Sequence, residues 1–151
     1  MTSIVFTVRP SAAFHGKLLE MVPVLDGIEL TQLVTDYEAA RAFDVVDGYS
    51  GIVPGVFRYG SLIEYYLGSP EDEYWIKEGK VALLGCECGE VGCWPLYAHV
   101  HATESSVVWR DFAQPFRPSR DYGGFGPFTF DRGDYERAVK DAIRLLAENV
   151  E

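Results

Sequence analysis

The sequence has few cysteines and no long apolar run, and its start lacks a targeting pattern. Its cysteine count of 3 in 151 residues is both small and odd, which argues against a full disulfide framework. No stretch approaches the roughly 18 uninterrupted apolar residues of a transmembrane helix. Residues 1–6 show no basic region followed by a long apolar segment. We therefore expect a cytoplasmic protein with reduced thiols and no membrane contact.

Positive charge is also scarce. The chain carries 13 Lys and Arg against 23 Asp and Glu, for a formal net charge of −10. Such a field repels a phosphate backbone, so we expect no nucleic-acid partner. It favours a basic protein partner, although a solvated acidic surface that maintains solubility is the simpler interpretation.

Specific catalytic motifs are missing as well. The chain contains no P-loop, no Gly-x-Gly-x-x-Gly after a strand, no His-Glu-x-x-His and no Gly-x-Ser-x-Gly. The segment 123–126, Gly-Gly-Phe-Gly, lacks the Lys-Ser/Thr that phosphate binding needs, which favours a turn. The sequence therefore predicts no catalytic residue and leaves open whether the protein is an enzyme.

What is present indicates one globular domain, residues 1–151. Apolar residues make up 48% of the chain and aromatic residues 14%, enough to fill one core. Residues 4–9 alternate apolar and polar side chains, as in a strand. The segment 11–25 is ambiguous: Leu18, Leu19 and Met21 fit a short helix before Pro23. Asp26-Gly27 then indicates a turn.

Two amphipathic helices are predicted, over residues 29–42 and near the C-terminus. In the second, apolar side chains recur at helical spacing from Tyr135 to Leu146. Asp131 is a suitable N-cap for this helix. Phe130 and Tyr135 have the spacing of a hydrophobic staple.

Between these helices the pattern predicts an antiparallel β-meander. Strands are expected at 81–88, 93–102 and 107–112, with tight turns at 77–80 and 103–106 and an edge strand at 128–130. A sheet with one apolar face and a helix with one apolar stripe bury each other. The expected fold is therefore α+β, with the meander packed against the C-terminal helix and one helix from the N-terminal half.

The most distinctive segment is Cys86-Glu87-Cys88-Gly89, followed by Gly92-Cys93-Trp94-Pro95-Leu96. It resembles the motif Cys-x-Cys-Gly…Gly-Cys-Trp-Pro-Leu of a family of bacterial proteins with no assigned activity. The resemblance covers the C-terminal two-thirds of the chain and implies a recurring domain without implying any catalytic residue. The downstream residues that share it are Trp109, Phe112, Gln114, Pro115, Arg117, Tyr122, Pro127, Phe128 and Tyr135.

Three interpretations of the cysteines remain open. If the turn closes with Cys88 opposite Cys93, then Cys86, Cys88 and Cys93 share one face and form a possible zinc site. His99 is not a suitable fourth ligand, because six residues of strand span about 20 Å. Buried apolar thiols are the simpler interpretation. A switchable Cys88–Cys93 pair is the third.

Two further groups of residues are candidates for a functional site. His99, His101 and Arg110 are expected on one face of the meander, where an exposed polar sheet face explains them more simply than catalysis. In the aromatic loop 114–128, Arg residues beside aromatic rings are typical of a binding hot spot, and equally of a loop that packs through its rings. The predicted partner-binding residues are Arg117, Arg120, Tyr122 and Phe125.

These observations favour a small, acidic, non-catalytic domain for protein interaction or regulation, comparable with an immunity protein or an antitoxin. The alternative is a zinc-supported domain, or a small thiol- or metal-dependent enzyme, that uses the cysteine hairpin. The first interpretation predicts no cofactor, and zinc is the cofactor that the alternative implies. The sequence does not specify an oligomeric state.

Overall fold

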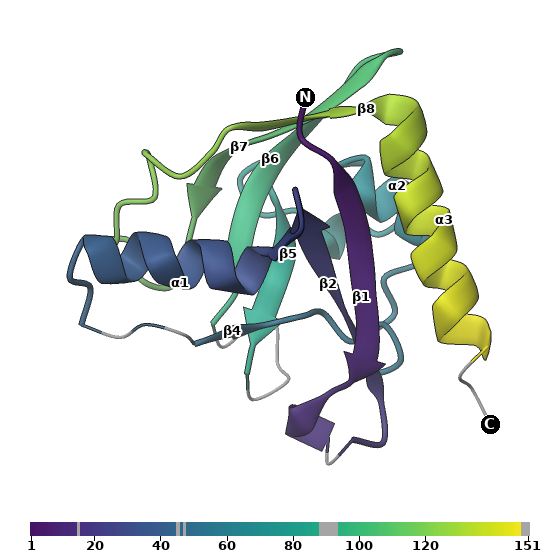
Figure 1. Ribbon diagram of the computed structural model, residues 1–151, viewed down its shortest axis with the longest axis horizontal. Helices are drawn as coiled ribbons and strands as arrows, with labels where there is room; N and C mark the ends of the chain where they lie inside the picture. Colours follow the sequence, from purple (N-terminus) through teal and green to yellow (C-terminus); the bar gives the residue numbers. More distant parts are fainter. Residues whose placement is uncertain (15, 45, 47, 88–93, 149–151) are drawn as a thin grey trace.

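The computed structural model describes residues 1–14, 16–44, 46, 48–87 and 94–148. Its strands form two antiparallel sheets, one with the order β1-β2-β3 and a strongly curved one with the order β4-β5-β6-β7-β8 (Figure 1). The strands are β1 (Ile4–Pro10), β2 (Leu19–Leu25), β3 (Ile28–Glu29), β4 (Tyr49–Ser50), β5 (Val81–Cys86), β6 (Leu96–Ala102), β7 (Ser106–Ala113) and β8 (Phe128–Asp131). The helices are α1 (Leu30–Ala40), α2 (Leu62–Tyr66) and α3 (Arg132–Glu148), with 3₁₀ turns at Ala12–Phe14 and Glu73–Trp75.

This architecture confirms the predicted α+β class and the predicted meander. In β6 the burial alternates along the strand, with Leu96, Ala98 and Val100 buried and His101 exposed. The turn at 103–106 closes with the Thr103 N–H donating to the Ser106 carbonyl at 2.8 Å. An extra residue in β7 shifts the register of the β6–β7 pair between the Tyr97 and His99 positions, and such a β-bulge bends the strand that contains it.

The three-stranded sheet contains the largest departure from the sequence expectation. The short helix suggested for Leu18 to Met21 was wrong, because β2 occupies this segment and pairs along its whole length with β1. Proline has no N–H to donate to a neighbouring strand. Pro23 is tolerated inside β2 because β3 pairs only with Val24 and Leu25, so Pro23 has no partner in β3 that would need its N–H. The turn Asp26-Gly27 is confirmed: both residues have positive φ, as a two-residue hairpin of type I′ requires.

One apolar core lies between the two sheets and the helices. Strand β5 is buried along its whole length, as its apolar sequence predicts. Helix α3 runs beside β1 and closes the side of the core away from α1 (Figure 1). Its Tyr135 hydroxyl accepts a hydrogen bond from the Trp109 indole N–H at 3.0 Å and donates to the Tyr66 carbonyl. These two bonds join α3 to β7 and α2.

The start of α3 has the predicted cap. The Asp134 N–H donates to Oδ2 of Asp131 at 3.0 Å. The rings of Phe130 and Tyr135 lie 5.4 Å apart, as a hydrophobic staple requires.

Replacing the cap, Asp131→Ala, is expected to lower the free energy of unfolding by about 1 kcal/mol, because the N–H of Asp134 loses its acceptor. Urea unfolding followed by circular dichroism measures this loss. Asp141→Ala, in the exposed middle of α3, is the control and should change stability by less than about 0.5 kcal/mol. Equal losses in the two variants would contradict the capping role.

Candidate functional site

The aromatic loop after β7 packs on α1 through its rings. Tyr122 and Phe125 are 2% and 7% exposed. Their rings lie 6.0 and 5.4 Å from the ring of Tyr37 in α1. The Tyr37 hydroxyl donates to the Asp121 carbonyl at 2.9 Å and accepts the Gly124 N–H at 3.2 Å. For Tyr122 and Phe125, burial therefore favours a loop that packs through its rings over a binding hot spot.

The two arginines of this loop have different environments. Arg117 is exposed, with its guanidinium 4.7 Å from the centre of the Trp94 ring. The side chain of Arg120 is only 6% exposed and forms a 2.8 Å ion pair with Glu38 of α1, which is fully buried. Its guanidinium also lies 4.6 Å from the Phe43 ring and 5.0 Å from the Trp94 ring. Arg117 is therefore available at the surface, whereas Arg120 is part of the interior.

Two tyrosines extend this ion pair into a buried polar cluster, defined here as Glu38, Tyr49, Arg120 and Tyr122. The Tyr122 hydroxyl donates to Oε2 of Glu38 at 2.5 Å, and the hydroxyls of Tyr49 and Tyr122 lie 2.8 Å apart. Burial raises the pKa of both tyrosines well above the usual value of 10, so both phenols stay neutral. Because Glu38, Tyr49 and Tyr122 are all at most 5% exposed, these three residues anchor the loop from the interior, and Arg120 is the member of the cluster that also lines a hollow.

The cysteine hairpin is only partly described. Cys86 ends β5, is 7% exposed and lies opposite Tyr49 of β4. Cys88 and Cys93 lie outside the described residues, so the zinc site at Cys86, Cys88 and Cys93 stays a prediction. Within the described ranges, no group of three or more His, Cys, Asp or Glu side chains has the geometry to hold a metal ion. Metal content of the untagged protein tests this prediction.

The histidines of β6 lie where strand alternation places them. His99 pairs with Arg110 of β7, which agrees with the shared face expected for them, and the His99 and His101 rings stack with centres 6.2 Å apart. Asp111 contacts Arg110, with 3.8 Å between the carboxylate oxygen and Nε. Both Arg110 and Asp111 are largely exposed, and the exposed side of the sheet accounts for this arrangement.

A first hollow, the cation-lined cavity, lies beneath the tight turn before β5. It has a volume of about 330 Å³. Basic residues contribute much of its wall, which is unusual for a chain with a net charge of −10. The predicted residue Arg120 forms one side. The lining residues are Lys77, Glu78, Lys80, Tyr97, Ala113, Gln114, Pro115, Pro118 and Arg120.

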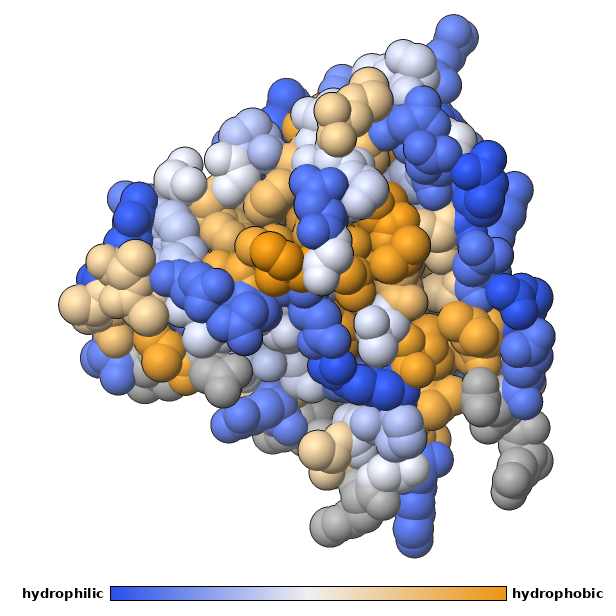
Figure 2. All heavy atoms as spheres, in the orientation of Figure 1, coloured by the Kyte–Doolittle hydropathy of each residue, from blue (hydrophilic) through white to orange (hydrophobic). Residues whose placement is uncertain are grey.

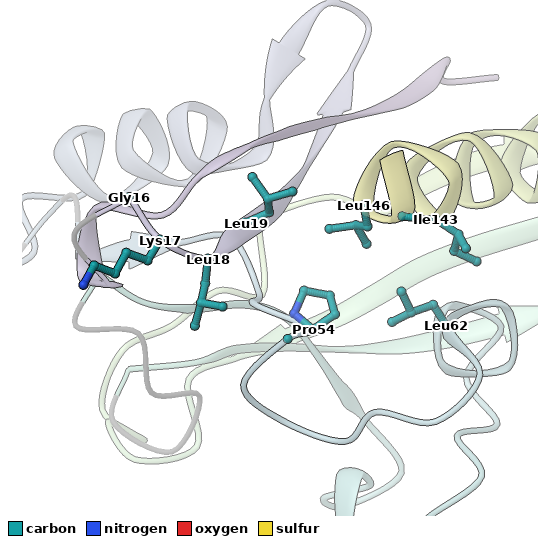
Figure 3. A pocket seen from close by; sticks show the side chains of 10 residues that line it. Gly16, Lys17, Leu18, Leu19, Pro54, Leu62, Ile143 and Leu146 are labelled. Atoms are coloured by element: carbon teal, nitrogen blue, oxygen red, sulfur yellow. The ribbon is translucent and has the colours of Figure 1, made fainter. Parts of the chain in front are cut away.

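A second and larger hollow, the apolar groove, lies between the start of β2, the loop after β4, α2 and the C-terminal half of α3. Its volume is about 880 Å³. In Figure 3, Leu62, Ile143 and Leu146 approach one end of the hollow from α2 and α3. Leu18, Leu19 and Pro54 approach from the other walls. Apolar side chains also gather on the surface between β1 and the lower half of α3 (Figure 2).

Sequence reasoning missed several of these residues. Glu38 had a detectable signal, because it follows Leu30 and Val34 at four-residue spacing on the buried stripe of α1. A carboxylate on an apolar stripe requires a buried partner. Tyr49 and the groove residues had no such signal, since their neighbours come from distant parts of the chain.

Along the described ranges, no helix is long and apolar enough to cross a membrane. Comparison with family models, curated proteins and solved structures found no match for this chain. The resemblance of the cysteine segment to a bacterial family therefore stays a prediction.

Proposed function

We propose that this protein is a small acidic interaction domain that binds an amphipathic helix of a basic partner protein in its apolar groove. The groove is the observation that carries the proposal. Its walls are mainly apolar, and Lys17 is the one charged residue among those that line it within the described part of the chain. Apolar hollows between helices are common docking sites for the apolar face of a partner helix.

The groove side chains are only partly buried by the protein itself. Leu18, Leu62, Ile143 and Leu146 all keep an intermediate exposure, and they converge on one hollow instead of being scattered. Val56, which follows the groove residue Gly55 in the sequence, is 39% exposed. A contiguous exposed apolar surface gains free energy when a partner covers it.

Charge selects the kind of partner. The net charge of −10 attracts a basic protein and accelerates its encounter with this one. Part of that charge lies near the groove in sequence, since the exposed acidic residues Glu71, Asp72 and Glu73 follow α2, which contributes Leu62 to the wall. Binding of an acidic domain to a basic partner is consistent with an inhibitory role, such as that of an immunity protein or an antitoxin.

A photo-reactive amino acid at Leu146 tests this proposal in extracts of the source cell. We expect it to cross-link a basic protein, whereas the same group at Arg144, on the exposed side of α3, gives little product. Binding of that purified partner should weaken at least about tenfold in Leu146→Ser and less than about twofold in Arg144→Ser. It should also weaken as salt rises, because screening reduces the attraction between opposite charges.

The two serine variants share a helix and a replacement residue, so their difference reports the groove and not helix propensity. Circular dichroism of each variant establishes that α3 is intact. A partner that is acidic, or that cross-links equally at both positions, would overturn the proposal. The same holds for a partner whose affinity is insensitive to Leu146→Ser.

A further inference from the structure

The cation-lined cavity is independent of the apolar groove, because the two hollows share no lining residue. The turn 77–80 forms its rim, β6 and the end of β7 contribute Tyr97 and Ala113, and the aromatic loop contributes the remaining wall. Tyr97 and Ala113 are paired across β6 and β7. Part of the wall is therefore a hydrogen-bonded sheet.

The turn holds two lysines directly opposite each other. Lys77 and Lys80 exchange both backbone hydrogen bonds, each at 2.9 Å. Opposed residues of an antiparallel pair project their side chains to the same face. Positive φ at Glu78 and Gly79 fixes this as a two-residue turn of type I′. Two like charges directly opposite each other repel, so this arrangement is stabilised when an anion lies between them.

The surrounding charge leaves these lysines largely uncompensated. Neither lysine forms an ion pair with a described residue, and the Nζ of Lys77 lies 5.4 Å from the centre of the Phe116 ring. Glu78, at the tip of the turn, is the one acidic residue among the described residues that line the cavity. The charge of Arg120 is matched by Glu38 at 2.8 Å. The cavity therefore has a local positive excess on an acidic protein.

The uncharged polar groups of the cavity are hydrogen-bond donors. Oε1 of Gln114 accepts the Phe116 N–H at 2.9 Å, which orients the amide. Its Nε2 has no acceptor among the described residues, although Gln114 is only 1% exposed. Burial raises the pKa of Tyr97, so its hydroxyl also keeps its proton. Ammonium, amide and phenol donors together suit a ligand that is rich in acceptors.

We propose that this cavity binds a compact polyanion, a small molecule with at least two anionic groups such as phosphates or carboxylates. The two ammonium groups hold the charge, and Gln114 and Tyr97 donate to the remaining oxygens. The volume of about 330 Å³ lies at the small end of the range for ligand pockets, which suits a compact ligand. Lysine suits phosphate as a point charge, and the same donors accept a polycarboxylate.

Isothermal titration of the full chain with pyrophosphate and with citrate tests the site. We expect saturable binding of at least one anion, weakened about tenfold or more in Lys77→Gln/Lys80→Gln. The same replacement at Lys140, on the exposed side of α3, should change affinity less than about twofold. Preference for pyrophosphate would assign phosphate esters, and preference for citrate would assign polycarboxylates.

Gln114→Glu provides a second variant. It keeps the carbonyl oxygen that accepts the Phe116 N–H and replaces the donor with an anion, so binding should be lost. Because a carboxylate at this buried position costs stability, thermal unfolding establishes that the variant is folded at the temperature of the titration. Amide shifts in nuclear magnetic resonance spectra should move at 77–80 and 113–118. Failure of both anions to saturate, or equal weakening in Lys140→Gln, would overturn the proposal without affecting the groove.

Discussion

Glu38→Gln is expected to lower the free energy of unfolding by about 3–5 kcal/mol, because it removes the buried carboxylate that pairs with the Arg120 guanidinium at 2.8 Å and leaves only the more distant, 92% exposed Asp44 as a described ion-pair partner, at 4.0 Å. Glu38 is fully buried, and its Oε2 accepts hydrogen bonds from both the Arg120 guanidinium and the Tyr122 hydroxyl. Arginine does not lose its proton in proteins, so this cation stays charged after the substitution. Urea unfolding at neutral pH, followed by circular dichroism, measures the loss.

Two further variants distinguish the loss of stability caused by removing the buried carboxylate partner of Arg120 from the loss caused by replacing any paired glutamate. Glu29→Gln makes the same change in a carboxylate that pairs with Arg9 at 2.7 Å but is 32% exposed, and should cost at most about 1 kcal/mol. Glu38→Leu combined with Arg120→Met removes both charges and should recover most of the stability. A loss below about 1 kcal/mol in Glu38→Gln would show that the ion pair does not hold the aromatic loop on α1.

Trp109→Ala is expected to cost a similar amount, about 3–5 kcal/mol, for a different reason. Trp109 in β7 is 0% exposed and packs on Phe130, with ring centres 4.8 Å apart. Its indole N–H also donates to the Tyr135 hydroxyl at 3.0 Å. The substitution leaves a cavity where β7, β8 and α3 meet and removes a buried hydrogen bond.

Tyr74→Ala is the matched control, since it also truncates an aromatic side chain, but one that is 80% exposed. It should change stability by less than about 0.5 kcal/mol. Tyr135→Phe, which removes the hydroxyl and keeps the ring, should cost about 1–3 kcal/mol and so separates hydrogen bonding from packing. Similar losses for Trp109→Ala and Tyr74→Ala would contradict the position of Trp109 in the core.

The features that the sequence predicted are those decided over a few neighbouring residues. The alternation of β6, the Asp131 cap and the turns at 26–27 and 77–80 all follow from side-chain periodicity and from backbone preferences that act locally. Segment 19–25 illustrates the limit. Its buried side chains include consecutive positions, so the pattern matches neither the alternation of a half-buried strand nor the spacing of an amphipathic helix. Pairing with β1 makes this segment a strand.

The sequence by itself determined the α+β class, the acidic charge, the C-terminal helix with its cap and most of the meander. Only the tertiary structure decided that Glu38 meets Arg120, which is 82 positions away, and that residues from four separate segments form the apolar groove. The physical reason is that periodicity fixes which face a side chain occupies along its own element. Which distant element covers that face depends on how the whole core packs, and no short stretch of sequence contains that information.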